Sequence, residues 1–185
     1  KKGGYMKKFA FFSILLFVSV PLLAGILGLS AGITGGVENW KLDAEGAETQ
    51  SLKAVGITAS FSPPIIPVGI RGDIEYAWKD VETPAGDIKL SDIFILIAIQ
   101  YSISAPIVPI SLYVGGGYEI STIGTDYSEY LGADGSITDS GFLVYGGLNL
   151  SLGLFAVFAE TGYGMIFADD KYTHIPLRGG IKISI

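Results

Sequence analysis

The stretch IPVGIRGDIEYAWKD, residues 66–80, alternates between two kinds of side chain. Its even positions carry mainly bulky apolar residues: Ile66, Val68, Ile70, Ile74, Tyr76 and Trp78. The odd positions are small or charged: Pro67, Gly69, Arg71, Asp73, Glu75, Ala77 and Lys79. A period of two is that of a β-strand, whose successive side chains point to opposite faces. The stretch therefore predicts a strand with one apolar and one polar face.

The same alternation recurs along the rest of the chain, with no helical pattern between the alternating segments. Eight segments show it, at approximately 26–35, 51–62, 66–79, 90–104, 107–121, 141–152, 154–167 and 172–185. Each has at least the roughly 9 to 11 residues that a tilted strand needs to cross a bilayer. The sequence therefore predicts an all-β fold, an eight-stranded antiparallel up-and-down barrel that spans a membrane.

The connections between these segments alternate in length. The polar connections 36–50, 80–89, 122–140 and 168–171 are rich in Gly, Asp, Glu and Thr, whereas 62–65, 104–107 and the region of Gly153 are short turns marked by proline or glycine. An up-and-down barrel places the first group at one end, here called the loop end, and the second group at the other, the turn end.

Barrel size decides which face points outward, because a soluble barrel with an apolar lumen would alternate in the same way. The interior of an eight-stranded barrel is only just wide enough for side chains to fill. About five large apolar residues per strand do not fit there, whereas the face made of Gly, Ser, Ala and a few long polar residues does. Charged residues make up only 16% of the chain, against roughly 25% in soluble domains. We therefore expect the apolar face to contact lipid.

Aromatic residues on the apolar face gather near the ends of the strands. Those near the loop end are Tyr76, Trp78, Tyr118, Phe142, Tyr163 and Phe167. Those near the turn end are Phe61, Tyr101 and Phe155. Aromatic rings are most stable at the depth of the lipid headgroups, so these nine residues are predicted to anchor the barrel at the two membrane interfaces.

The N-terminal segment has the pattern of a secretory signal peptide. Met6-Lys7-Lys8 is followed by an apolar run to Leu23 and by the small residue Ala24. We expect a signal peptide over residues 1–24, with 1–5 as an upstream extension, and the barrel over 25–185. The alternative, a transmembrane helix that continues beyond Ala24, is weakened by proline and glycine in the run.

Charge and cysteine content exclude several classes of function. Removal of residues 1–24 takes away four lysines and leaves eight basic and eighteen acidic residues, a formal net charge of −10. Such a surface repels nucleic acid, which is therefore not an expected partner. The chain has no cysteine, so it has no disulfide framework, thiol nucleophile or lipoprotein-type acylated cysteine.

The whole mature chain resembles the small eight-stranded outer-membrane β-barrel proteins of Gram-negative type bacteria, the OmpA/OmpX-like or OmpW-like group. The resemblance rests on the N-terminal pattern, the eight strands, the unequal loops and the closing stretch PLRGGIKISI, residues 176–185. Ile185 stands where that group commonly has a terminal aromatic residue. The resemblance implies location in the bacterial outer membrane, contact with membrane lipid and outer-membrane glycolipid, insertion by the barrel-insertion machinery, and a monomer.

Polar residues on the other face form a predicted lumen network with both signs of charge. Its members are Arg71, Asp73, Glu75, Gln100, Tyr113, Glu119, Tyr145, Asn149, Glu160, His174, Arg178 and Lys182. Glu160 and Arg178 become direct cross-strand neighbours if the last hairpin turns about Asp169, and opposite charges attract across a lumen of low dielectric. The network is expected to plug the barrel in place of an apolar core; the alternative is a narrow solute path lined by charge.

No motif in the sequence predicts an enzyme. His174 is the only histidine, and a catalytic role would need a nucleophile and an orienting carboxylate beside it. The loop acids lack the ligand spacing of a calcium loop, and neither a metal nor a cofactor is predicted. The run Gly115-Gly116-Gly117 opens no helix, so it is not expected to bind a nucleotide; it is expected to let the barrel wall bend or to let tyrosine side chains pack over it.

Three functional hypotheses follow from these patterns. The first is an integral outer-membrane barrel with a structural or surface-interaction role and a plugged lumen. The second is a narrow channel or transporter for small solutes, hydrophobic ones included. The third is a soluble periplasmic barrel that binds a ligand inside an apolar lumen.

Overall fold

The computed structural model describes residues 28–43, 46, 48–63, 66–83, 86–104, 108–125, 136–168 and 171–184. The expected signal peptide over 1–24, with its extension 1–5, lies outside these residues. Within them, no helix has the length and apolarity that a membrane span requires. Eight strands are formed: β1 Leu29–Leu42, β2 Gln50–Phe61, β3 Val68–Thr83, β4 Gly86–Ser104, β5 Ile110–Thr125, β6 Ser136–Leu152, β7 Phe155–Ile166 and β8 Tyr172–Ser184.

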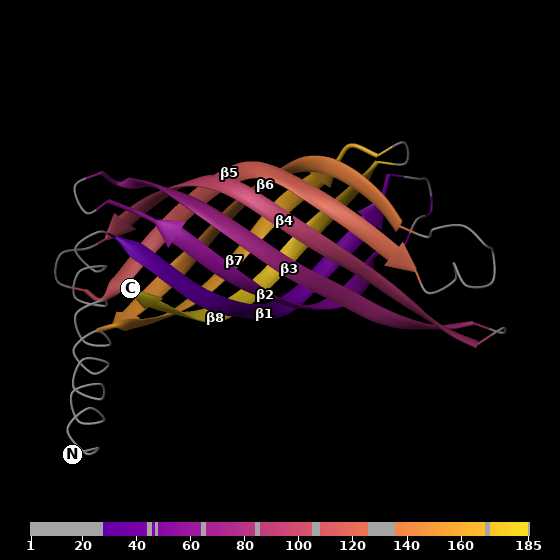
Figure 1. Ribbon diagram of the computed structural model, residues 1–185, viewed down its shortest axis with the longest axis horizontal. Helices are drawn as coiled ribbons and strands as arrows, with labels where there is room; N and C mark the ends of the chain where they lie inside the picture. The colour runs from indigo at the N-terminus through magenta and orange to yellow at the C-terminus, as the bar shows by residue number, and fades with distance from the viewer. Residues whose placement is uncertain are drawn as a thin grey trace, which may run out of the picture.

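The eight strands form one closed antiparallel barrel in which each strand pairs with its neighbours in sequence (Figure 1). β1 also pairs with β8, in a register that runs from Ser30 opposite Ser184 to Leu42 opposite Tyr172. The strands cross the long axis of the barrel obliquely, as the closure of a sheet requires. The predicted all-β up-and-down barrel is confirmed.

Several strands extend further toward the loop end than the alternation predicted. β1 continues to Leu42 instead of ending near residue 35, and β3 and β4 remain paired as far as Thr83 and Gly86. β5 and β6 likewise extend to Thr125 and Ser136. The predicted loops 36–50, 80–89 and 122–140 were therefore too long. Only the part of a strand within hydrocarbon needs an apolar face, so a polar strand end carries no such pattern.

The isoleucine-rich face lies on the outside of the barrel. In β4, the side chains of Ile97 and Ile99 are 65% and 63% exposed, whereas Leu96 and Ala98 are each 2% exposed. The other strands follow the same rule, with exposed residues that include Ile33, Ile57, Ile70, Val114, Val144, Val157 and Leu177. A continuous apolar belt of this kind is stable in hydrocarbon and not in water. The barrel therefore spans a membrane, and the hypothesis of a soluble barrel with an apolar lumen is wrong.

Glycines on the inner wall leave space for two tyrosine rings. A Cβ atom at Gly115 would lie 2.4 Å from Cζ of Tyr145, and one at Gly147 would lie 2.6 Å from Cζ of Tyr113. Both distances are too short for carbon atoms that are not bonded to each other. The predicted packing of a tyrosine over the glycine run of β5 is thus confirmed, and a second glycine does the same on β6.

We predict that Ile97→Arg destabilises the barrel, because Ile97 lies near the middle of β4 on the lipid-facing side. An arginine at the bilayer midplane costs about 2–4 kcal/mol in barrels of this kind. The measurement is reversible unfolding by denaturant in lipid vesicles, followed by tryptophan fluorescence.

Ile137→Arg provides the matched control. Ile137 is also 65% exposed, but it lies in the loop-end part of β6, where an arginine costs about 0–1 kcal/mol because it reaches the interface. Equal losses of stability in the two variants would contradict the assignment of the isoleucine belt to hydrocarbon.

Candidate functional site

The twelve polar residues of the predicted lumen network project into the barrel. Eleven of them are buried and Asn149 is half-buried near the turn end. They come from β3, β4, β5, β6, β7 and β8, so most of the wall contributes to the interior. The structure adds buried polar residues that the sequence analysis did not place there: Thr34, Glu38, Thr58, Asp92 and Ser121.

Arg71 joins opposite walls of the barrel. Its guanidinium on β3 donates to both carboxylate oxygens of Glu160 on β7, with Nη2 2.8 Å from Oε1. Its Nε donates to Asp73 at 2.8 Å, and Tyr113 donates its hydroxyl hydrogen to Glu160 at 2.8 Å. The guanidinium also lies over the ring of Tyr145, 4.8 Å from the centroid. Two forked hydrogen bonds in a dry interior hold this pair firmly.

Arg178 forms a second buried ion pair cluster on β8. Its guanidinium lies 3.0 Å from Glu38 and 2.9 Å from Glu75. Glu160 is the direct cross-strand partner of Arg178, at the register that the sequence analysis proposed. The carboxylate of Glu160 is 3.8 Å from Arg178, however, and its shorter contacts go to Arg71. The residue spacing within the β7–β8 hairpin predicted the register of Glu160 and Arg178. It could not predict that Glu160 bonds to Arg71, which lies four strands away on β3.

Glu38 was absent from the predicted network because the analysis placed it in a loop. In the structure it lies on β1, is fully buried and contacts both Arg178 and His174. The signal was present in the parity of Thr34, Gly36, Glu38 and Trp40, which continues the inward face of the strand. On the other face, Gly35, Asn39 and Lys41 interrupted the apolar alternation and concealed it.

His174 bridges two carboxylates and has no access to solvent. Its Nδ1 lies 2.9 Å from Glu38 and its Nε2 lies 2.7 Å from Glu119, and all three side chains are fully buried. Its ring stacks on Phe94 with centroids 4.9 Å apart. A Cβ at Gly164, opposite on β7, would lie 1.9 Å from Nε2 of His174. The imidazole therefore fills the space that a side chain at position 164 would need. A doubly protonated ring satisfies both carboxylates, because each nitrogen is then a donor.

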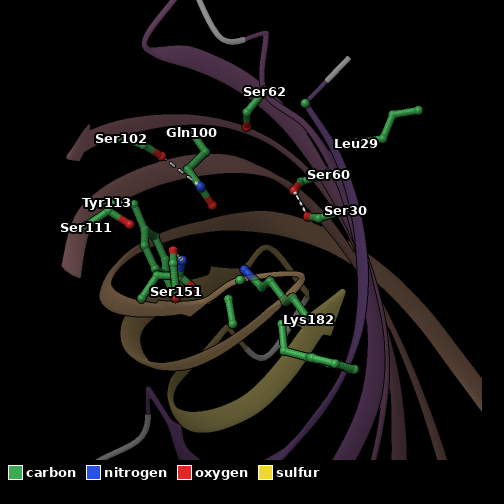
Figure 2. Close-up of a pocket in the computed structure, with 15 residues that line it drawn as sticks. Leu29, Ser30, Ser60, Ser62, Gln100, Ser102, Ser111, Tyr113, Ser151 and Lys182 are labelled. Carbon is green, nitrogen blue, oxygen red and sulfur yellow. Dashed lines mark hydrogen bonds between the residues drawn. The ribbon is translucent and has the colours of Figure 1, made fainter. Parts of the chain in front are cut away.

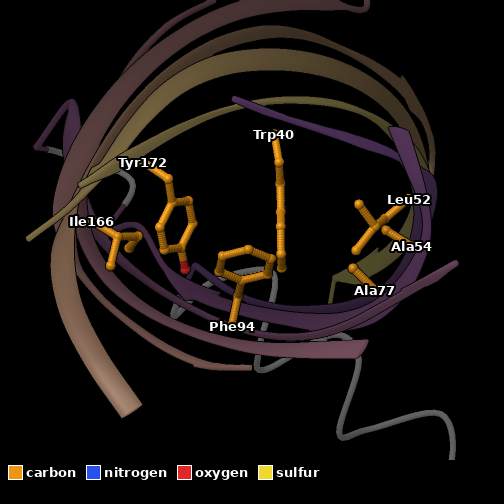
Figure 3. Close-up of a cluster of buried hydrophobic side chains, with 7 residues drawn as sticks. All are labelled: Trp40, Leu52, Ala54, Ala77, Phe94, Ile166 and Tyr172. Carbon is orange, nitrogen blue, oxygen red and sulfur yellow. The ribbon is translucent and has the colours of Figure 1, made fainter. Parts of the chain in front are cut away.

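An apolar layer crosses the lumen nearer the loop end (Figure 3). Trp40 packs edge-on against Phe94, with centroids 6.0 Å apart, and against Tyr172 at 5.3 Å. Buried side chains of the wall complete it: Leu52, Ala54, Ala77 and Ile166. Beside this layer, Ser121 donates to Asp92 at 2.7 Å and shares a hydrogen bond with Tyr172. Rings and aliphatic groups thus fill the lumen together with the ion pairs.

The turn end of the lumen is polar and contains a cavity. The cavity has a volume of about 220 Å³ (Figure 2). Four members of the predicted network line it: Gln100, Tyr113, Asn149 and Lys182. Gln100 donates to Ser102 at 3.1 Å and accepts from Tyr145 at 3.4 Å.

The nine predicted interface aromatics lie on the outer face. Seven of them are exposed, and Tyr76 and Trp78 are half-buried because their rings stack with centroids 5.5 Å apart. Phe142 and Phe167 also contact each other at the loop end, with centroids 5.8 Å apart. Both pairs lie toward the loop end of the barrel, where the sequence predicts contact of the rings with the lipid headgroups.

Metal binding gains no support from the described residues, in which no group of three or more histidine and acidic side chains has a geometry that holds a metal ion. The carboxylates of the lumen instead contact arginine, histidine, serine or tyrosine side chains. The chemistry available in the interior is therefore ion pairing and hydrogen bonding between fixed groups.

We predict that Arg71→Met strongly destabilises the barrel, because it leaves the buried carboxylates of Glu160 and Asp73 without their shortest ion pair. Removal of one partner from a buried pair costs about 3–5 kcal/mol. The measurement is the free energy of unfolding by urea in lipid vesicles. The double variant Arg71→Met/Glu160→Met is expected to recover part of the loss.

Lys53→Met is the control, since Lys53 is an exposed cation of β2, and surface substitutions change stability by about 0.5 kcal/mol or less. A loss in Arg71→Met no greater than that in Lys53→Met would contradict the cross-lumen pair.

Comparison with known proteins places the chain by its fold. No family model and no curated protein matches the sequence. The crystal structure of Neisserial surface protein A is similar, with a TM-score of 0.66 and 16% identity over 85% of this chain and 97% of that one. The crystal structure of Ail, the attachment invasion locus protein of Yersinia pestis, in complex with the heparin analogue sucrose octasulfate is also similar. Its TM-score is 0.56, with 15% identity over 84% of this chain and 99% of that one. The chain thus has the fold of the small eight-stranded outer-membrane β-barrels, as the sequence predicted.

Proposed function

We propose that this protein is a closed outer-membrane barrel with a structural or surface-interaction role, and neither a channel nor an enzyme. The observation that carries the proposal is the buried pair of Arg71 and Glu160, which crosses the lumen between opposite walls. A solute that passed through would have to break this pair and leave both charges without partners, which costs several kcal/mol.

Two further layers support a closed lumen. Arg178 connects Glu38 with Glu75 next to the first pair, and the layer of Trp40, Phe94 and Tyr172 follows toward the loop end. Aromatic rings at centroid distances of 5.3 and 6.0 Å leave no space for water between them. Eight strands enclose an interior that side chains just fill, so closure is the expected state of a barrel of this size.

The environment of His174 argues against catalysis. Both ring nitrogens face carboxylates, and the ring is fully buried between Phe94 and the wall. A general base needs a reacting proton within hydrogen-bond reach, and the two carboxylates occupy both positions from which the imidazole would act. We infer that His174 stabilises the interior by joining β8 to β1 and β5.

The outer surface suits a monomer that contacts lipid and glycolipid along its wall. Because β1 pairs with β8, the barrel has no edge strand to which a second copy could add. Insertion by the barrel-insertion machinery fits a chain whose last strand, β8, closes the sheet. We propose that the loop end faces outward and makes the contacts with other molecules.

The comparisons suggest a surface role for the loop end. One similar structure is named a surface protein and the other an attachment protein bound to a sulfated sugar analogue. The present chain is acidic, with 18 acidic and 12 basic residues, and several of its acids lie in the polar connections. Like charges repel, so we propose that this barrel contacts cationic partners, or glycolipid phosphates through divalent cations, rather than sulfated sugars.

We predict that the wild-type protein shows no discrete conductance steps in planar lipid bilayers, because the cross-lumen ion pair and the aromatic layer block ions. A sixteen-stranded porin, whose lumen is an aqueous channel, serves as the positive control for insertion and detection. Insertion of the barrel itself is verified by its protection from protease in vesicles made from the same lipids.

Reproducible unitary steps from wild-type protein would contradict the closed lumen and favour the channel hypothesis. The variant Arg71→Ser/Glu160→Ser removes the ion pair and retains the aromatic layer of Trp40 and Phe94. If this variant shows conductance steps and the wild type does not, the ion pair is the barrier to ions. If neither protein shows steps, the aromatic layer also closes the lumen.

A further inference from the structure

A buried cation at the turn end is left without a counter-ion. Lys182 on β8 is only 8% exposed, and among the residues that the structure describes no carboxylate makes an ion pair with it, although Arg71 and Arg178 each have several. Its ammonium lies over the rings of Phe158 and Tyr113, 4.1 and 5.3 Å from their centroids. Aromatic rings attract a cation without neutralising it.

The surroundings of Lys182 form a cavity with hydrogen-bonding groups on every side. Figure 2 shows its amine directed toward the middle of a ring of polar side chains. The polar residues that line this cavity of about 220 Å³ are Ser30, Ser60, Ser62, Gln100, Ser102, Ser111, Tyr113, Asn149 and Ser151. They come from the turn ends of β1, β2, β4, β5 and β6, and no acidic residue is among them.

The charge of this cavity is opposite to that of the chain. The protein carries a formal net charge of −6, and the carboxylates of the lumen lie toward the loop end, paired with arginine or histidine. Glu160 accepts hydrogen bonds from Arg71 and from Tyr113, which lines the cavity. A buried ammonium in a polar, acid-free cavity favours an anion, because the anion compensates a desolvated charge.

The donors of the cavity favour a phosphate group. Serine hydroxyls donate from several directions, which suits the oxygens of a tetrahedral anion better than the two oxygens of a planar carboxylate. The volume corresponds to about seven water molecules, enough for a small polyol phosphate.

We propose that the turn-end cavity binds the phosphate monoester of a small polyol, with Lys182 against the phosphate. The site is distinct from the closed part of the lumen, since Tyr113 separates the cavity from Glu160 and Arg71. It therefore holds whether or not the barrel conducts ions. In an outer membrane with the loops outside, this cavity opens toward the periplasm.

The test is calorimetric titration of the full barrel in an alkyl maltoside detergent, which contains no phosphate, with glycerol 3-phosphate as the probe. We expect saturable binding to the wild type and at least tenfold weaker binding to Lys182→Met. Lys41→Met, which removes an exposed lysine at the loop end of β1, should bind like the wild type. Absence of saturable binding to the wild type, or equal affinity in Lys182→Met, would overturn the proposal.

Two other ligands test which kind of phosphate the cavity binds: inorganic phosphate, a free monoester or a lipid headgroup. Inorganic phosphate fills less of the cavity and should bind more weakly than glycerol 3-phosphate; equal affinities in the wild type would overturn a polyol monoester as the ligand. Short-chain phosphatidylglycerol presents the same group as a lipid headgroup. Tighter binding of this lipid than of glycerol 3-phosphate would overturn a free monoester as the ligand and assign the cavity to a headgroup.

A second measurement needs no variant at all. The rate of acetylation of Lys182 by acetic anhydride, followed by peptide mass spectrometry of the folded wild-type barrel, should fall at least fivefold in saturating glycerol 3-phosphate, while Lys41 reacts at an unchanged rate. Unchanged acetylation of Lys182 under those conditions would overturn the proposal even if Lys182→Met fails to fold.

Discussion

Hydrocarbon offers no hydrogen bonds, and this one constraint determines the rest of the structure. Every backbone N–H and C=O within the membrane must find a partner in the sheet, so the wall has to close. The pairing of β1 with β8 from Ser30 to Leu42 completes that closure. Once the wall is closed, the apolar side chains must point outward to the lipid, and the small and polar ones are enclosed. The protein is in this sense an inverted soluble domain.

The enclosed polar groups then have to satisfy one another. In a dry interior an isolated charge is costly, and a charge with a well-oriented partner is stable. Arg71, Arg178 and His174 each contact two or more carboxylates. For each of them one contact joins strands that are not neighbours in the sheet, with Glu160, Glu75 and Glu119 respectively. Ion pairs thus cross-link the walls in the way that side-chain packing does in an ordinary core, while Trp40, Phe94 and Tyr172 supply a smaller apolar layer.

Period-two alternation was sufficient to predict the fold, because lipid imposes a strong and simple pattern on each strand. It also placed Arg71, Glu160 and Arg178 inside, since parity follows directly from a strand's position. It could not identify which side chains contact one another inside the barrel, because partners such as Arg71 and Glu160 are 89 residues apart and lie on opposite walls. Glu38 was missed for a different reason: it lies in the loop-end part of β1, where Gly35, Asn39 and Lys41 interrupt the apolar alternation. Local patterns specify a strand's faces, whereas long-range partners depend on barrel geometry.

The distribution of charge among the strands links closure of the wall to neutralisation of the interior. Of the basic groups that are buried among the described residues, His174, Arg178 and Lys182 all belong to β8, and Arg71 alone belongs to an earlier strand. The acids Glu38, Glu75 and Glu119 lie on β1, β3 and β5, and their nearest basic partners lie on β8. An open sheet without β8 would hold carboxylates that repel one another. Pairing of β8 with β1 and β7 therefore closes the wall and neutralises these carboxylates at the same time, so electrostatics as well as backbone hydrogen bonds favour the closed barrel.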